Sequence, residues 1–150
     1  MATVTLTRME ERYPVGVTPS CAVAVLRHDG DGGGYASWSA TIGLRSGEAT
    51  MRVPGHYAGV LAERLRAAEE RFSPGRRVAR DEYLDLTALT TDDVETLALS
   101  STARSPVRVT VEVPRGEIDE LASLLTQAQE LIETLRQGLG LVPDSLPEAL

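Results

Sequence analysis

The sequence has no lysine, a single cysteine and few aromatic residues. The lone Cys21 excludes a disulfide within the chain. With one Trp, one Phe and four Tyr, the core has to be built mainly from aliphatic side chains. No stretch approaches the ~20 apolar residues of a membrane-spanning helix, and the first residues include Glu10 and Glu11 rather than the apolar run of a signal peptide. These absences predict a cytoplasmic protein without membrane insertion.

Basic charge is also scarce, since 15 Arg stand against 22 Asp and Glu and the net charge is −7. General nucleic-acid binders depend on Lys and Arg at the phosphates, so we expect protein partners rather than nucleic acid. The remaining composition, 42% hydrophobic and 25% charged, is typical of a globular domain. A chain of 150 residues buries enough surface to fold without a metal or a disulfide.

Alternation of apolar and polar residues predicts half-buried strands. In the clearest example, 107–113, four valines face one side, while Arg, Thr and Glu face the other. Segment 21–26 is apolar on both faces, which is expected of a central strand. Further strands are predicted at 4–6, 38–44, 49–53, 84–87 and 97–100. Short links between them predict antiparallel sheets.

Two segments, 57–72 and 117–137, have apolar residues at helical spacing instead. When the chain is shifted so that Val53-Pro54 falls on Val113-Pro114, the apolar positions of the two helices coincide. The predicted fold class is therefore α+β, with two βββα repeats at about 1–72 and 80–137, each an antiparallel sheet followed by a long helix. Residues 1–137 are interpreted as one domain, followed by an apolar tail at 138–150.

Residues suited to catalysis are few. Cys21 and His28 lie at opposite ends of one predicted strand, about 23 Å apart at ~3.3 Å per residue, so Cys21 is interpreted as a core residue. His28, Asp29 and Asp31 lack a fourth metal ligand. The glycine-rich segment 29–34 precedes a strand rather than the helix that a phosphate loop requires. We therefore expect no catalytic residue, no metal, no cofactor and no enzymatic activity.

Two features are candidates for interaction. Arg76, Arg77 and Arg80 form a basic cluster that could hold a phosphate or an acidic partner, although Asp81 and Glu82 follow directly and a solvated linker is the alternative. The tail is too apolar to stay in water and is expected to pack back on the domain or to dock on another chain. Its candidate contact residues are Leu139, Leu141, Val142 and Leu146. A homo-oligomer, a dimer or a trimer, is predicted, with the tail or a sheet face at the contact.

Several stretches resemble the SsgA-like proteins of spore-forming mycelial bacteria. They are Leu26–Asp29, Gly34–Thr41 and Leu97–Ser101, the last followed by a valine-rich strand and a final helix. The entry to the first helix, Val53–Leu61, differs from that family's usual pattern. The resemblance implies a Whirly-like fold of two repeats. It also implies a role in cell division, septation or sporulation through protein contacts with the division machinery.

Two other functions fit the predicted fold. A Whirly-like protein that binds single-stranded nucleic acid would need basic and aromatic residues on one surface. A toxin-neutralising immunity protein would use an acidic surface against a basic toxin, and the second half of the chain has a similar order of elements to such proteins. The predicted function remains that of a non-enzymatic protein-binding factor, with these two as alternatives.

Overall fold

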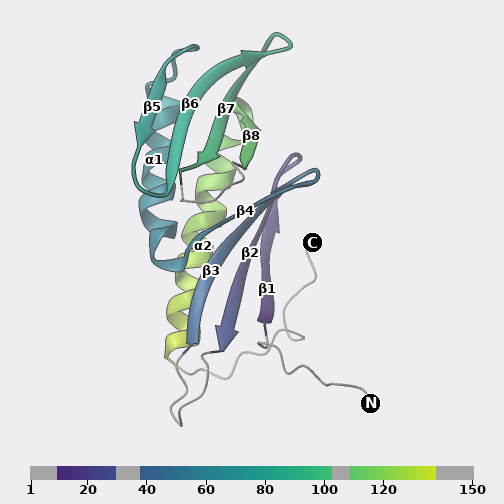
Figure 1. Ribbon diagram of the computed structural model, residues 1–150, viewed down its shortest axis with the longest axis vertical. Coiled ribbons are helices and arrows are strands. Elements are labelled where there is room, and N and C mark those ends of the chain that lie inside the picture. Colours follow the sequence, from purple (N-terminus) through teal and green to yellow (C-terminus); the bar gives the residue numbers. More distant parts are fainter. Residues whose placement is uncertain (1–9, 30–37, 103–108, 138–150) are drawn as a thin grey trace.

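The computed structural model describes residues 10–29, 38–102 and 109–137. Two four-stranded antiparallel sheets follow one another along the chain, each with its strands in sequence order (Figure 1). The first contains β1 (Glu10–Val17), β2 (Ala22–Asp29), β3 (Trp38–Ser46) and β4 (Ala49–Pro54). The second contains β5 (Arg77–Arg80), β6 (Leu84–Thr91), β7 (Val94–Ser101) and β8 (Thr110–Pro114). A short 3-10 turn and a helix follow each sheet: η1 (Gly55–Tyr57) with α1 (Ala58–Glu70), and η2 (Arg115–Glu117) with α2 (Ile118–Arg136).

The predicted α+β class, with two repeats of an antiparallel sheet and a long helix, is confirmed. Both helices lie where helical spacing predicted them, and β2 is an interior strand as expected. Each repeat has one strand more than the three predicted. The extra strands, β1 and β5, each contain a register shift, which breaks the alternation that marks a strand in the sequence. The strand predicted at 4–6 lies outside the described residues.

The same backbone turn leads into both helices. Pro54 has φ −57° and ψ 145°, and Pro114 has φ −57° and ψ 143°. Proline fits this position because its ring fixes φ near the helical value and no ladder hydrogen bond is needed from its nitrogen. The matched prolines, the shared 3-10 turns and the equal strand numbers support the interpretation of the chain as two copies of one unit.

Each helix packs on the sheet of the other repeat. Helix α2 contacts β1 and β2 of the first sheet, and α1 contacts β5 of the second. At one such contact, a Cβ on Gly16 of β1 would lie 2.6 Å from a methyl group of Leu124, so the glycine lets α2 approach closely. One hydrophobic cluster consequently runs through both repeats, from Tyr13 and Ile42 to Leu99 and Val113. Among the described residues, no helix is long and apolar enough to cross a membrane.

Polar contacts also join the repeats. The hydroxyl of buried Tyr57, at the start of α1, donates to Asp81 in the turn before β6. Burial first, and then this hydrogen bond, raise the pKa of Tyr57. Arg64 of α1 pairs with the same carboxylate at 3.3 Å. The beginning of the second sheet is therefore anchored to the first helix.

Candidate binding surface

The outer face of the first sheet brings three arginines together: Arg12 on β1, Arg45 on β3 and Arg52 on β4. Their neighbours Tyr13, Leu44 and Met51 are almost completely buried in the core. Successive side chains of a strand point to opposite faces, so the arginines have to point outward. All three are exposed.

The strand register places the three arginines in three successive outward-facing rows, at the corners of a triangle on the sheet. Arg12 is opposite Leu26 of β2, whereas Arg52 is opposite Gly43 of β3, one outward-facing row further along. Arg45 lies in the row after that, opposite Ala22. This arrangement follows from the antiparallel pairing, because the ladder partners decide which residues of different strands share a row.

The arginines surround an open hollow, which we call the arginine groove. It has a volume of about 170 Å³ and is lined by Arg12, Ala22, Ala24, Leu26, Gly43, Arg45, Thr50 and Arg52. A second hollow of about 340 Å³ continues from it past Arg12 and Arg45 toward the β1–β2 turn, where Val17 and Pro19 line it. Together they form a depression with arginines at its sides and small or apolar residues at its floor.

Gly43 contributes to the depth of the groove by having no side chain. A Cβ at this position would lie 3.3 Å from Cδ1 of Leu26, closer than most such contacts. The two neighbours of Gly43 along β3 are the buried Ile42 and Leu44, so a larger residue here would point outward and fill the floor. The glycine therefore leaves room for an occupant.

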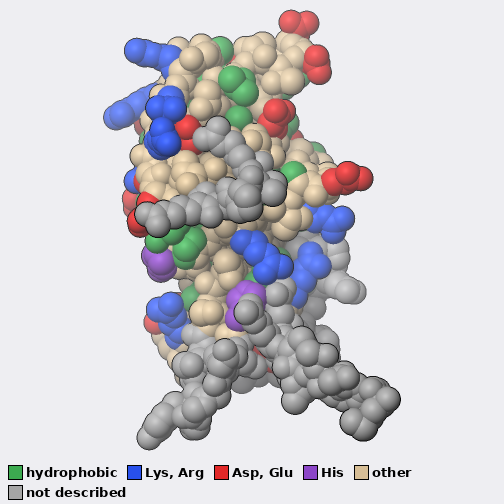
Figure 2. All heavy atoms as spheres, in the orientation of Figure 1, with side chains coloured by type: hydrophobic (Ala, Val, Ile, Leu, Met, Phe, Trp, Pro, Cys, Tyr) green, Lys and Arg blue, Asp and Glu red, His purple; other side chains and the backbone are tan. Residues whose placement is uncertain are grey.

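The groove is a local basic surface on an acidic chain. None of its lining residues is acidic, although the net charge of the chain is −7. In Figure 2, one group of blue side chains lies in front of the first sheet and another lies at the upper left over β5 and α1, while red side chains lie at the tips of the β3–β4 and β6–β7 hairpins. A positive groove with an apolar floor suits a ligand that carries carboxylates beside apolar groups.

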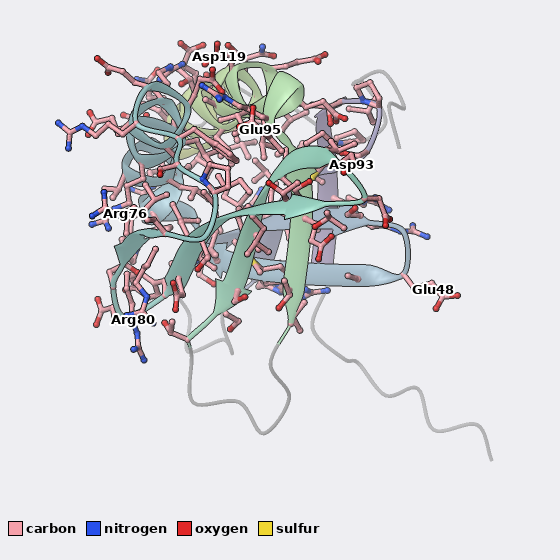
Figure 3. All side chains as sticks on the ribbon, turned by 90° about the horizontal axis from the view of Figure 1, so that it is seen from above. Glu48, Arg76, Arg80, Asp93, Glu95 and Asp119 are labelled. Atoms are coloured by element: carbon pink, nitrogen blue, oxygen red, sulfur yellow. The ribbon has the colours of Figure 1, made fainter. Side chains whose placement is uncertain are left out.

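The arginines of the predicted basic cluster, Arg76, Arg77 and Arg80, do not surround a common hollow as those of the arginine groove do. Arg77 pairs with Asp85 through Nε and Oδ1 at 3.2 Å, so part of its charge is compensated. Figure 3 shows Arg76 and Arg80 spread along β5 at one edge of the molecule, both pointing outward. The cluster stays a candidate surface. The other predicted contact residues, Leu139, Leu141, Val142 and Leu146, lie outside the described residues.

Sequence reasoning did not single out the arginine groove, although it predicted the strand at 49–53 that carries Arg52. Arg12, Arg45 and Arg52 come from three strands, and no local motif joins them. The sequence held only a weaker signal, because Arg52 occupies a polar position in the predicted strand at 49–53 and Arg45 directly follows the one at 38–44, whereas Arg12 lies where no strand was predicted. Only the register of four strands shows that these positions converge.

Cys21 lies in the core, with 3% of its surface exposed. Burial is the main cause that raises the pKa of its thiol to about 11, so the thiol remains protonated at neutral pH and is a poor nucleophile. His28, seven residues away, contacts the Thr41 hydroxyl through Nε2 at 3.1 Å. The interpretation of Cys21 as a core residue is confirmed. Within the described ranges, no three His, Cys, Asp or Glu side chains gather as metal ligands.

Comparisons of the chain with protein-family models, with curated proteins and with solved structures found no match.

Proposed function

We propose that this protein is a non-enzymatic, cytoplasmic binding factor that holds an acidic segment of a partner protein in the arginine groove. The observation that carries the proposal is the convergence of Arg12, Arg45 and Arg52 around an apolar floor on the outer face of the first sheet. The resemblance to SsgA-like proteins suggests that such a partner belongs to the machinery of cell division or sporulation.

The composition of the groove favours a protein segment over single-stranded nucleic acid. Proteins that bind single strands stack bases on aromatic side chains along a positive surface. The residues that line the groove include no aromatic side chain on which a base could stack. An immunity protein would present an acidic surface to its toxin, whereas this hollow is basic.

The apolar floor is as important as the charges. An exposed ion pair stabilises a contact by about 0.2–1 kcal/mol, so three arginines contribute at most about 3 kcal/mol. That alone corresponds to a dissociation constant of several millimolar at about 3 kcal/mol. Burial of apolar surface on Ala24 and Leu26 adds about 25 cal/mol per Å². The expected ligand therefore combines carboxylates with apolar side chains.

A pull-down from the native host, read by mass spectrometry, tests this proposal. The double variant Arg12→Glu/Arg45→Glu should lose the partner that the wild type captures. The matched control, Arg76→Glu/Arg80→Glu, carries the same change in net charge on β5 and its preceding turn, and it should retain the partner. Equal capture by the wild type and the groove variant would contradict the proposal, and loss in the control alone would move the site to the predicted basic cluster.

Binding to labelled single-stranded DNA and RNA at low and high salt tests the nucleic-acid alternative. We expect no measurable binding near physiological salt. Tight binding that weakens steeply with salt and disappears in the groove variant would make nucleic acid the ligand instead.

A further inference from the structure

Among the described surfaces, the tip of the β6–β7 hairpin has the properties that the arginine groove requires of a ligand. Its two-residue turn consists of Asp92 and Asp93, and Val94 follows directly. All three side chains are exposed. Figure 3 labels Asp93 at the end of the hairpin, where it also lines an open hollow with Glu95 and Arg115. We call Asp92, Asp93 and Val94 the acidic tip.

The backbone of the tip is unusual for its sequence. Asp92 has φ 50° and Asp93 has φ 64°. Turns with positive φ at both central residues favour Asn-Gly or Asp-Gly, because a glycine avoids the clash of Cβ. Here both positions carry a carboxylate in a conformation that Asp tolerates better than most residues. The narrow turn thus holds two adjacent negative charges out in solvent.

Exposed apolar residues lie on both surfaces. The described residues include three large hydrophobic side chains that are well exposed: Val17 at 48%, Val60 at 40% and Val94 at 49%. Val17 lines the second hollow, which continues from the arginine groove toward the β1–β2 turn. Val94 belongs to the acidic tip. The tip therefore offers two carboxylates beside one apolar side chain, and the groove offers arginines beside an apolar wall.

We propose that the arginine groove of one copy binds the acidic tip of a second copy. This inference rests on the proposed function of the groove as a site for acidic protein segments and names one such segment. The tip belongs to the second sheet and the groove to the first, and Figure 1 places the tip at the far end of the molecule from β1 and β2. A copy cannot fill its own groove, so the contact runs head to tail and either closes a ring or continues as a chain.

The β3–β4 turn, Gly47 and Glu48, offers one carboxylate rather than two, and shape favours the acidic tip over the acidic start of α2. Asp119 and Glu120 lie in the first turn of α2, and a helix with its side chains is about 10 Å wide, too broad for a hollow of this size. Two of the sheet edges, β1 and β5, are poorly suited to an alternative assembly by strand pairing. Edge strand β1 contains Pro14 and a register shift, and edge strand β5 has four residues and a register shift.

Light scattering on the full chain, with two neutralised variants, tests the contact. One variant is Arg12→Gln/Arg45→Gln in the groove, and the other is Asp92→Asn/Asp93→Asn in the tip. Asn accepts positive φ as readily as Asp does, so the turn is retained, and circular dichroism confirms that both variants are folded. At tens of micromolar and low salt, the wild type should exceed the monomer mass of 16.1 kDa, and each variant alone should run as a monomer.

The mixture of the two variants gives the sharpest result. Each mixed pair keeps one intact groove and one intact tip, so an equimolar mixture should form dimers and nothing larger. Raising the salt to about 0.5 M should return the wild type toward the monomer, because the Debye length then falls well below 10 Å. A wild type that stays monomeric, a tip variant that assembles like the wild type, or a mixture without dimers would overturn the inference.

A second probe separates this inference from the proposed function. A labelled hexapeptide that alternates glutamate and valine, and so offers carboxylates beside apolar side chains, should bind the wild type at least tenfold more tightly than the groove variant. If it does so while the wild type is monomeric, the groove binds acidic segments and only the self-assembly is wrong. If the two proteins bind the probe equally weakly, the proposed function of the groove fails as well.

Discussion

At the scale of single residues, Glu117 joins the two repeats. Its Oε1 accepts hydrogen bonds from the Thr18 hydroxyl at 2.6 Å, the Ser20 hydroxyl at 2.7 Å and the Ser20 amide at 2.9 Å. Thr18 and Ser20 belong to the β1–β2 turn, and Glu117 precedes α2. Burial alone would raise the pKa of Glu117, but the three donors outweigh it and lower the pKa. The charged form therefore stabilises the contact between the repeats.

The substitution Glu117→Gln should lower the free energy of unfolding at pH 7 by about 1–3 kcal/mol, as expected for hydrogen bonds to a charged group. Because the folded pKa is lower than the unfolded one, this contribution is complete above the unfolded value of about 4.3. It disappears as the pH falls through the folded value. Urea unfolding of both proteins between pH 7 and pH 3 measures the difference, which should shrink below about pH 4.

Glu63→Gln is the control for this measurement, because Glu63 is exposed on α1. Its effect should stay within about 0.5 kcal/mol at every pH. A difference between wild type and Glu117→Gln that stays constant down to pH 3 would contradict the role assigned to the carboxylate.

At the scale of the elements, two glycines near the start of α1 have opposite surroundings. A Cβ on buried Gly55 would lie 2.8 Å from the carbonyl oxygen of Ala40, which is part of the β3 backbone. A Cβ on Gly59 would lie 2.8 Å from the side-chain amide of Gln129 on α2. The Ala40 backbone cannot move away from a new Cβ without disturbing the sheet. The exposed side chain of Gln129, in contrast, can rotate away.

The two alanine substitutions should therefore change stability in opposite directions. Gly55→Ala should destabilise the protein by about 1–3 kcal/mol through overpacking. Gly59→Ala should be neutral or stabilising by up to about 1 kcal/mol, because alanine favours the helix. Thermal and urea unfolding of the two variants measures the change in the free energy of unfolding. A decrease of more than about 1 kcal/mol for Gly59→Ala would mean that the contact between α1 and α2 cannot accommodate the added methyl group.

At the scale of the whole molecule, each repeat needs the other to fold, because each helix packs on the sheet of the other repeat. Helix α2 covers β1 and β2, and α1 lies against β5. A half that ends at Gly75 would keep the first sheet but lose the helix that covers its inner face. Tyr13, Val25 and Ile42, all completely buried in the intact protein, would then meet water. The two halves are thus parts of one folding unit despite their similar architecture.

Fragments 1–75 and 76–150 should therefore be largely unfolded when each is produced alone. They should regain cooperative unfolding when mixed, because each supplies the helix that the other sheet lacks. Circular dichroism and urea titration of the separate and mixed fragments provide the measurement. Cooperative unfolding of either fragment by itself would show that a sheet and its own helix suffice.

The sequence by itself determined the local structure. Alternation predicted the strands that pair regularly, helical spacing predicted α1 and α2, and the matched Val-Pro pairs predicted the repeat. These signals are local, because a side chain's periodicity depends only on its neighbours along one element. The same reasoning missed β1, where Pro14 and the register shift at Gly16 interrupt the alternation.

Only the tertiary structure decided which helix covers which sheet and which side chains share a surface. Arg12, Arg45 and Arg52 converge because four strands pair in one register, and a shift of one residue in β1, β3 or β4 would turn an arginine toward the core. Register and helix placement depend on contacts between segments far apart in the chain. No pattern within a single segment records those contacts, so the groove and its suggested partner, the acidic tip, could be recognised only in the folded molecule.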